Sequence, residues 1–140
     1  VNTRQYLSSL VYNLIVSSGH AKPPDLQVDI VELPLSTRVA VPLGLIVNEL
    51  ATNSLKYAFS ERGGGQLSVL LKVENEMLQL SISDNGAGID ANARVDSGLG
   101  QKLTEAFTTQ LDGQMTTESD KTGTRHMLVF PHISAESKIW

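Results

Sequence analysis

Residues 66–84 read QLSVLLKVENEMLQLSISD, and this stretch decides how the chain can fold. Strand-favouring residues fill Gln66–Glu74 and Met77–Asp84, and in the second run apolar and polar side chains alternate with the period of a half-buried strand. Only Asn75 and Glu76 separate the two runs, and two residues are the shortest common connection of a β-hairpin. The sequence therefore predicts a pair of antiparallel strands.

Ahead of the hairpin the sequence predicts a helix, a strand and a second helix. The first helix spans about Asn2–Ser17, where an apolar stripe recurs at helical spacing, and Gly19 is expected to end it. That stripe consists of Leu7, Leu10, Val11, Leu14 and Ile15. A half-buried strand is expected from Leu26 to Leu33, ended by Pro34. The second helix is expected to begin near Pro42, because a residue in the first helical turn does not need its N–H.

After the hairpin the sequence predicts a loop, a third helix and two more strands. The loop is the Gly-, Asp- and Asn-rich stretch from Asn85 to Gly100, and the helix spans about Leu99–Leu111. Strands are expected over Gln114–Glu118 and Arg125–Phe130, joined by a polar turn that contains Gly123.

This order of elements predicts an α+β fold, a two-layer α/β sandwich in which three helices cover one face of a mixed sheet of about five strands. The 140 residues suit a single domain, with a core over residues 1–131 and a loosely tied tail over 132–140. Because the chain begins with Val rather than Met, we expect it to be cut from a longer protein.

Composition and charge exclude or disfavour several functional classes. The chain has no cysteine, which excludes disulfide scaffolds, cysteine-ligated metals and cysteine nucleophiles, and favours an intracellular origin. Its net charge of −4 disfavours binding to nucleic acid. The longest stretch without a polar side chain, Val39–Val47, is far shorter than the roughly 20 residues that span a bilayer. We therefore expect no membrane contact by this chain and a cytoplasmic location, although a longer parent could be anchored to a membrane.

The second helix carries polar residues that suit a phosphate and its metal ion. Glu49, Asn53 and Lys56 lie at i, i+4 and i+7, within about 60° of one another on a regular α-helix. Together with Asn48 and Thr52 they offer oxygens to a hard cation such as Mg²⁺ and a positive charge to phosphate. A solvated helix face with a Glu–Lys ladder is the plainer alternative.

Glycines follow the hairpin in two groups. Asp84 ends its strand just before Gly86 and Gly88, and a carboxylate there could accept a hydrogen bond from an adenine amine while the glycines let a planar base approach. An ordinary glycine-rich turn is the alternative. Gly98 and Gly100 open the third helix, where free N–H groups can bind an anion. A loop with two glycines would look the same.

The four segments together resemble a known family. Asn48-Glu-Leu-x-x-Asn53-x-x-Lys-Tyr57, then Asp84-x-Gly86-x-Gly88, Gly98-x-Gly100 and Gly-Thr124 are similar to the N, G1 and G2 boxes and terminal Gly-Thr of the GHKL ATPases. That superfamily includes gyrases, large heat-shock chaperones, mismatch-repair ATPases and histidine kinases. Residues 42–59 most resemble the ATP-binding domain of bacterial sensor histidine kinases, closest to the HWE-related group. The resemblance runs from about residue 1 to residue 131.

The resemblance implies roles on the helical side of the site. Asn53 would ligate Mg²⁺ that bridges the ATP phosphates, and Lys56 would touch phosphate. Glu49 would be the catalytic residue, as base or orienter of the incoming histidine. Tyr57 closes the same box and would line the nucleotide site, and the helix start at Leu99 would help to neutralise the phosphates.

The resemblance also implies roles on the sheet side and in the loop. Asp84 would accept from the adenine amine, and Thr124 would support that end of the site. Four glycines would shape the pocket and its lid, namely Gly86, Gly88, Gly98 and Gly100. The segment from Asp90 to Ser97 is short for such a lid and lacks the Phe-centred box of many histidine kinases.

The implied function is ATP-dependent phosphorylation of a histidine. The partners would be ATP or ADP, the dimerisation and histidine-phosphotransfer domain of the same protein, and a response regulator downstream. The acceptor would lie outside this chain, since His20, His126 and His132 are expected to be structural or solvated. One alternative is a phosphotransfer or adaptor scaffold that keeps the fold without catalysis. Another is a related GHKL protein-serine kinase or ATPase.

Overall fold

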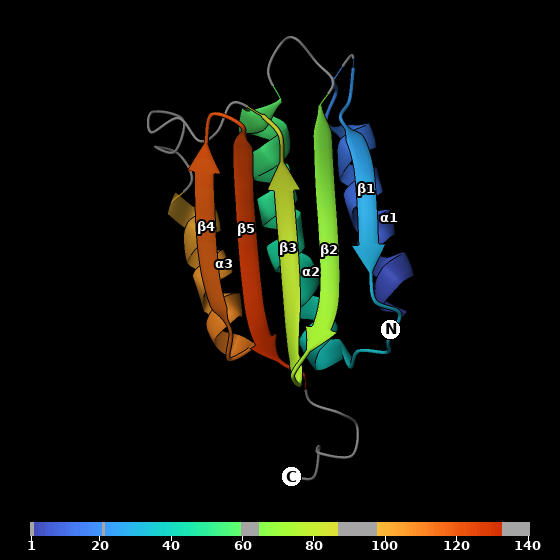
Figure 1. Cartoon of the computed structure of the whole chain (residues 1–140), viewed down its shortest axis with the longest axis vertical. Coiled ribbons are helices and arrows are strands. Elements are labelled where there is room, and N and C mark those ends of the chain that lie inside the picture. The colour runs from blue at the N-terminus through green and yellow to red at the C-terminus, as the bar shows by residue number, and fades with distance from the viewer. Residues whose placement is uncertain (1, 21, 60–64, 87–97, 133–140) are drawn as a thin grey trace.

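The computed structural model describes residues 2–20, 22–59, 65–86 and 98–132. In this part of the chain a sheet and a layer of helices face each other (Figure 1). The elements in chain order are α1 (Thr3–Ser17), β1 (Asp25–Ile30), α2 (Thr37–Asn53), the π-helix η1 (Ser54–Ala58), β2 (Gln66–Glu74), β3 (Met77–Asp84), α3 (Gly98–Gln110), β4 (Gln114–Asp120) and β5 (Gly123–Pro131).

The sheet has the strand order β1-β2-β3-β5-β4. β1 runs parallel to β2, and the remaining neighbours are antiparallel, so the sheet is mixed. At the β2–β3 hairpin, Asn75 and Glu76 have φ values of 52° and 63°, the two positive angles that a two-residue turn of type I′ requires. The predicted hairpin is confirmed, with both strands at the predicted bounds.

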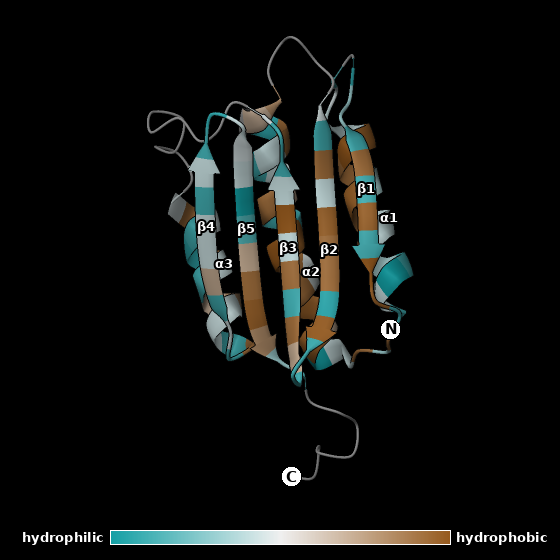
Figure 2. Ribbon diagram, in the orientation of Figure 1, coloured by the Kyte–Doolittle hydropathy of each residue, from teal (hydrophilic) through white to brown (hydrophobic). Residues whose placement is uncertain are grey.

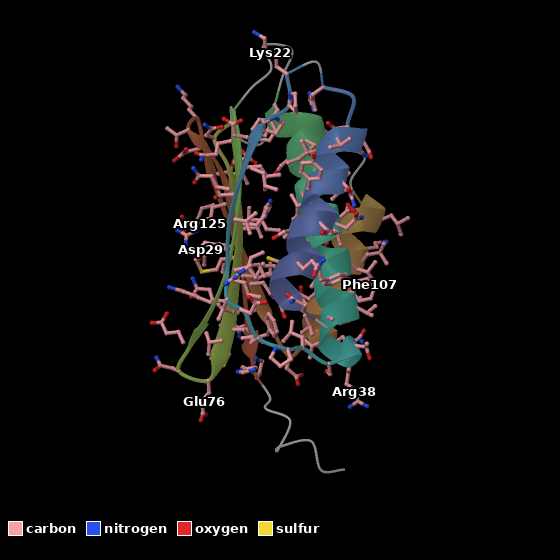
Figure 3. The ribbon with its side chains drawn as sticks, turned by 90° about the vertical axis from the view of Figure 1, so that its right-hand side faces the viewer. Lys22, Asp29, Arg38, Glu76, Phe107 and Arg125 are labelled. Atoms are coloured by element: carbon pink, nitrogen blue, oxygen red, sulfur yellow. The ribbon has the colours of Figure 1, made fainter. Side chains whose placement is uncertain are left out.

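The helices cover one face of the sheet, with α2 in the middle and α1 and α3 beside it (Figures 1 and 3). The core between the layers comes from alternate residues of β2, β3 and β5 and from the inner stripes of α1 and α2. Its fully buried members include Leu7, Val11, Leu43, Ile46, Val47, Leu67, Leu80, Ile82 and Phe130. Figure 2 shows the apolar residues concentrated in the central strands, while β4 is mostly hydrophilic. The predicted α+β sandwich is confirmed.

The second helix begins at Thr37, five residues before the predicted start. Ser36 is its N-cap residue, and the Ser36 carbonyl accepts from the N–H groups of Val39 and Ala40 at 3.0 and 2.8 Å. This extra turn buries Ala40, and Pro42 therefore lies inside the helix with its ring buried. Burial of the added turn outweighs the one backbone hydrogen bond that the proline cannot make.

β1 ends at Ile30, whereas the alternation predicted a strand as far as Leu33. The Ile30 carbonyl accepts from Arg4 Nε at 3.0 Å, and Thr3 Oγ1 donates to the Leu33 carbonyl. The start of α1 therefore takes up backbone groups that a longer strand would have offered to β2. At the other edge the strands are longer than predicted, because β4 reaches Asp120 and Gly123 belongs to β5 rather than to the turn.

Candidate functional site

Three segments meet at Asp84, where β3 ends. The Asp84 side chain is only 9% exposed. Its Oδ1 accepts from the backbone N–H groups of Gly86 at 3.1 Å and Thr124 at 3.3 Å, and its Oδ2 accepts from Ser54 Oγ at 2.9 Å. We call these four residues the Asp84 cluster. They come from the start of η1, the end of β3 with the turn that follows it, and the start of β5, which all lie at the upper end of Figure 1.

The hydrogen bonds of the Asp84 cluster leave Oδ2 of the carboxylate able to accept a further donor. A carboxylate offers about four acceptor positions, and burial is tolerated only when they are largely used. Oδ1 accepts two protein donors, whereas Oδ2 accepts one from the described residues. A ligand N–H group is the kind of donor that this second oxygen can still accept.

Glycine is required at two positions of this junction. A Cβ on Gly86 would lie 2.3 Å from the carbonyl oxygen of Ala58, the last residue of η1. Gly123 has a φ of +147°, and a Cβ there would lie 1.9 Å from the carbonyl oxygen of Asp84. Because both obstacles are backbone atoms, any larger residue would force the three segments apart.

Thr124 donates its backbone N–H to Asp84, and its side chain fixes it to the neighbouring strand. The residue is 5% exposed, and its Oγ1 shares a hydrogen bond of 2.8 Å with Ser119 Oγ on β4. The two residues are paired in the sheet register. This bond fixes the start of β5, from which the Thr124 N–H reaches Asp84.

A second group of predicted residues lies where α2 meets α3. The Glu49 carboxylate packs directly against Gly100, since a Cβ on that glycine would lie 1.7 Å from Oε1. Asn53 lies one turn beyond Glu49 and is half-buried, and Lys56 is exposed. We call Glu49, Asn53, Lys56 and Gly100 the Glu49 side. It joins the Asp84 cluster through the chain, because Ser54 directly follows Asn53.

The helix changes type between the two groups. α2 ends at Asn53, and η1 continues as a π-helix over Ser54–Ala58. Such wider turns are rare and often lie at functional sites. Consequently the 60° arc predicted for a regular α-helix holds for Glu49 and Asn53 but not for Lys56.

The other predicted residues belong to neither of the two groups. Gly98 begins α3 with nothing within 4 Å of a Cβ, and Leu99 is 73% exposed. Tyr57 lies in η1. Gly88 and the segment 90–97, predicted as pocket and lid, lie outside the described residues.

Sequence reasoning missed Ser54. A signal was present, because Val47, Leu50 and Ser54 follow one another at helical spacing on the buried side of α2. A hydroxyl on such a stripe needs a partner once it is buried, and here the partner is Asp84.

The described residues contain no group of three or more His, Asp or Glu side chains able to hold a metal ion by themselves. The amide oxygen of Asn53 suits Mg²⁺, which prefers oxygen ligands and commonly binds together with substrate phosphates. The donor set therefore fits a metal ion that arrives with a phosphorylated ligand.

The model of one protein family matches residues 38–134 of this chain, and its description is histidine kinase-, DNA gyrase B-, and HSP90-like ATPase. The chain belongs to this family. The match contains the Asp84 cluster and the Glu49 side, so the GHKL resemblance is confirmed.

Similar proteins include several histidine kinases. Blue-light-activated histidine kinase 2 of Erythrobacter litoralis is 31% identical over 103 residues, which cover 71% of this chain and 29% of the relative. The solved histidine kinase domain of a blue-light activated histidine kinase from Erythrobacter litoralis has a TM-score of 0.84 at 22% identity. The match covers 94% of this chain and 65% of that domain. An Acinetobacter baumannii histidine kinase has a TM-score of 0.75 at 17% identity, over 95% of this chain and 66% of that one.

The chain thus spans less than a third of its curated relative. The structural likenesses show that this chain shares its fold with part of these histidine kinases. Among the helices in the described ranges, none is long and apolar enough to cross a membrane.

Proposed function

We propose that this chain is the ATP-binding catalytic domain of a sensor histidine kinase, within the HWE-related group. It binds Mg·ATP and passes the γ-phosphate to a histidine on a separate domain of the same protein, from which a response regulator receives it. Family membership supports ATP binding, and the names of its relatives support the choice of histidine kinase among the functions of the family.

The Asp84 cluster is the observation that carries the proposal. An adenine amine is an N–H donor that suits Oδ2, the oxygen with one described protein donor. Guanine has a carbonyl oxygen at the equivalent ring position, which the Asp84 carboxylate would repel. Buried polar sites of this kind reject a ligand that lacks the matching group, so the site favours ATP over GTP.

The Glu49 side suits the phosphates. Among the described residues, Lys56 and the N–H groups at the start of α3 can help to neutralise a polyanion in a chain of net charge −4. When bound, Mg²⁺ supplies charge neutralisation and alignment of the phosphates, which are most of what phosphoryl transfer requires. Asn53 is the residue of this side that would hold it.

Two observations on Glu49 support a role in acting on the phosphate acceptor. Its carboxylate lies against Gly100, and Glu49 precedes Asn53 by one helical turn. From there it can orient the imidazole of the incoming histidine or accept its proton.

Calorimetric titration of the chain with Mg·ATP and Mg·GTP tests the nucleotide assignment. We expect ATP to bind and GTP to bind at least tenfold more weakly. Asp84→Ala should lose about 1.5–3 kcal/mol, or roughly ten- to a hundredfold in ATP affinity. The matched control is Asp29→Ala, an exposed aspartate on β1 that Figure 3 labels. An unchanged affinity in folded Asp84→Ala would exclude the adenine contact.

Phosphorylation tests the transfer step. With radiolabelled ATP, the chain alone should not label its own histidines, and a separately added phosphotransfer domain should be labelled weakly because tethering normally raises the effective concentration. Alkaline quenching preserves phosphohistidine for the measurement. Label on His20, His126 or His132 would contradict an acceptor outside this chain. Absence of nucleotide binding would favour the scaffold alternative.

A further inference from the structure

His20 makes a long-range hydrogen bond to the end of the helix that carries the site. It lies in the connection between α1 and β1, two residues before Lys22, which Figure 3 labels at the upper end of the molecule. His20 Nε2 lies 2.7 Å from the carbonyl oxygen of Leu55, 35 residues away, and the contact is partly buried. A carbonyl can only accept, so Nε2 carries the proton in this bond.

The Leu55 carbonyl needs such a donor. The last four carbonyls of a helix have no partner within it, and η1 ends at Ala58, so Leu55 is among those four. Its side chain is 5% exposed, which limits access of water to this turn. An imidazole N–H at a helix C-terminus satisfies the carbonyl and is favourably placed in the field of the helix.

The turn that His20 holds connects both parts of the site. Its first residue, Ser54, donates to Asp84, and the carbonyl of its last residue, Ala58, packs against Gly86. Asn53 directly precedes the turn, and Lys56 belongs to it. A displacement of this single turn would therefore move the residues that hold the proposed adenine contact together with the proposed phosphate contacts.

We propose that His20 is a positioning residue of the nucleotide site, which acts by fixing the π-helical turn at Leu55. The inference rests on the proposed function, because it assigns the turn to a site that binds nucleotide. The other two histidines make different hydrogen bonds. His126 Nδ1 bonds to Thr117 Oγ1 at 2.9 Å. His132 lies beside the β2–β3 turn, where its backbone N–H donates to the Glu76 carbonyl. Of these three hydrogen bonds, that of His20 is the one that reaches the helix that carries the site.

Four variants test the proposal by calorimetry with Mg·ADP, at a temperature where circular dichroism shows each to be folded. His20→Leu removes the donor and should weaken binding about three- to tenfold, the range of one hydrogen bond. His20→Gln can place an N–H near the position of Nε2 and should bind within about twofold of the parent chain. His20→Asn has a shorter side chain and should bind like His20→Leu. His132→Leu, the matched control, should leave binding unchanged.

The Gln variant separates positioning from general packing. If packing alone mattered, His20→Gln and His20→Asn would bind alike, whereas the proposal requires Gln to restore affinity and Asn not to. Equal affinities in these two variants, or parent-like affinity in folded His20→Leu, would overturn the role. Should His20→Leu not fold, the Gln and Asn pair decides the matter.

Amide hydrogen exchange measured without nucleotide tests the role of His20 independently of the proposed function. We expect His20→Leu to exchange faster than the parent over residues 54–58, and His20→Gln to exchange like the parent. If the parent chain binds no nucleotide, the proposed function fails, and the exchange result still shows whether His20 fixes the turn. Unchanged exchange in His20→Leu would overturn the positioning of the turn itself.

Discussion

The Asp84 cluster and the Glu49 side are built in opposite ways. Among the described residues, the donors to the Asp84 carboxylate are two backbone N–H groups and one buried hydroxyl, and two glycines let the backbones approach closely. On the Glu49 side, Asn53 and Lys56 make no side-chain hydrogen bond to another described residue, and Lys56 is exposed. Under the proposed function, we therefore expect the adenine contact to be formed in advance and the phosphate contacts to become ordered when the ligand and its metal ion bind.

The largest effect should be a slower rate of phosphoryl transfer when Glu49 is changed. Glu49→Gln keeps the size of the side chain but removes its charge and basicity. We expect transfer to an acceptor domain to slow by roughly 10²- to 10⁴-fold if Glu49 is the general base, while ATP affinity stays nearly unchanged. Single-turnover labelling measures the first quantity and calorimetry the second. Full transfer activity in Glu49→Gln would leave the residue with only its packing against Gly100.

The next largest effect should follow from breaking the preformed cluster. Gly86→Ala forces a Cβ against the Ala58 carbonyl, and overpacking of this kind costs about 1–3 kcal/mol. We expect a lower free energy of unfolding in urea and a loss of ATP affinity of about tenfold or more. Gly98→Ala is the matched control, because nothing lies within 4 Å of its Cβ. Equal stability of the two variants would show that the η1–β3 junction can open without cost.

Asn53→Ala should separate the two groups of residues, because its effect on ATP affinity should depend on Mg²⁺. If the amide oxygen binds Mg²⁺ with the phosphates, ATP affinity should fall about tenfold in the presence of Mg²⁺ and much less in EDTA. The same titrations on Asp84→Ala should show equal losses under both conditions. A metal-independent loss in Asn53→Ala would place that side chain on the nucleotide rather than on the ion.

The smallest effect should come from Ser54→Ala. It removes one of three donors to Asp84 and leaves the two backbone donors in place. We expect about a threefold loss in ATP affinity, within the range of a single hydrogen bond, and no change in transfer rate at saturating ATP. Ser9→Ala, on the exposed side of α1, is the control. A loss as large as that of Asp84→Ala would mean that the hydroxyl sets the orientation of the carboxylate.

Local patterns predicted the elements wherever one interaction dominates. The hairpin followed from two turn residues that accept positive φ, and α1 followed from an apolar stripe at helical spacing. Predictions failed where a distant segment competed for the same groups. Arg4 and Thr3 shortened β1, and burial of Ala40 extended α2 past a proline that would otherwise mark a helix start.

The same division holds for the site. The sequence by itself determined the candidate residues, because a carboxylate at the end of a strand and glycines at the start of a helix are local features. Only the tertiary structure decided that Ser54 bonds to Asp84, that Glu49 packs on Gly100, and that the turn after Asn53 is a π-helix held by His20. These contacts join residues 30 to 51 positions apart, so no periodicity along the chain encodes them. They exist because burial leaves a hydroxyl, a carboxylate and a carbonyl each in need of a partner that only the folded chain brings near.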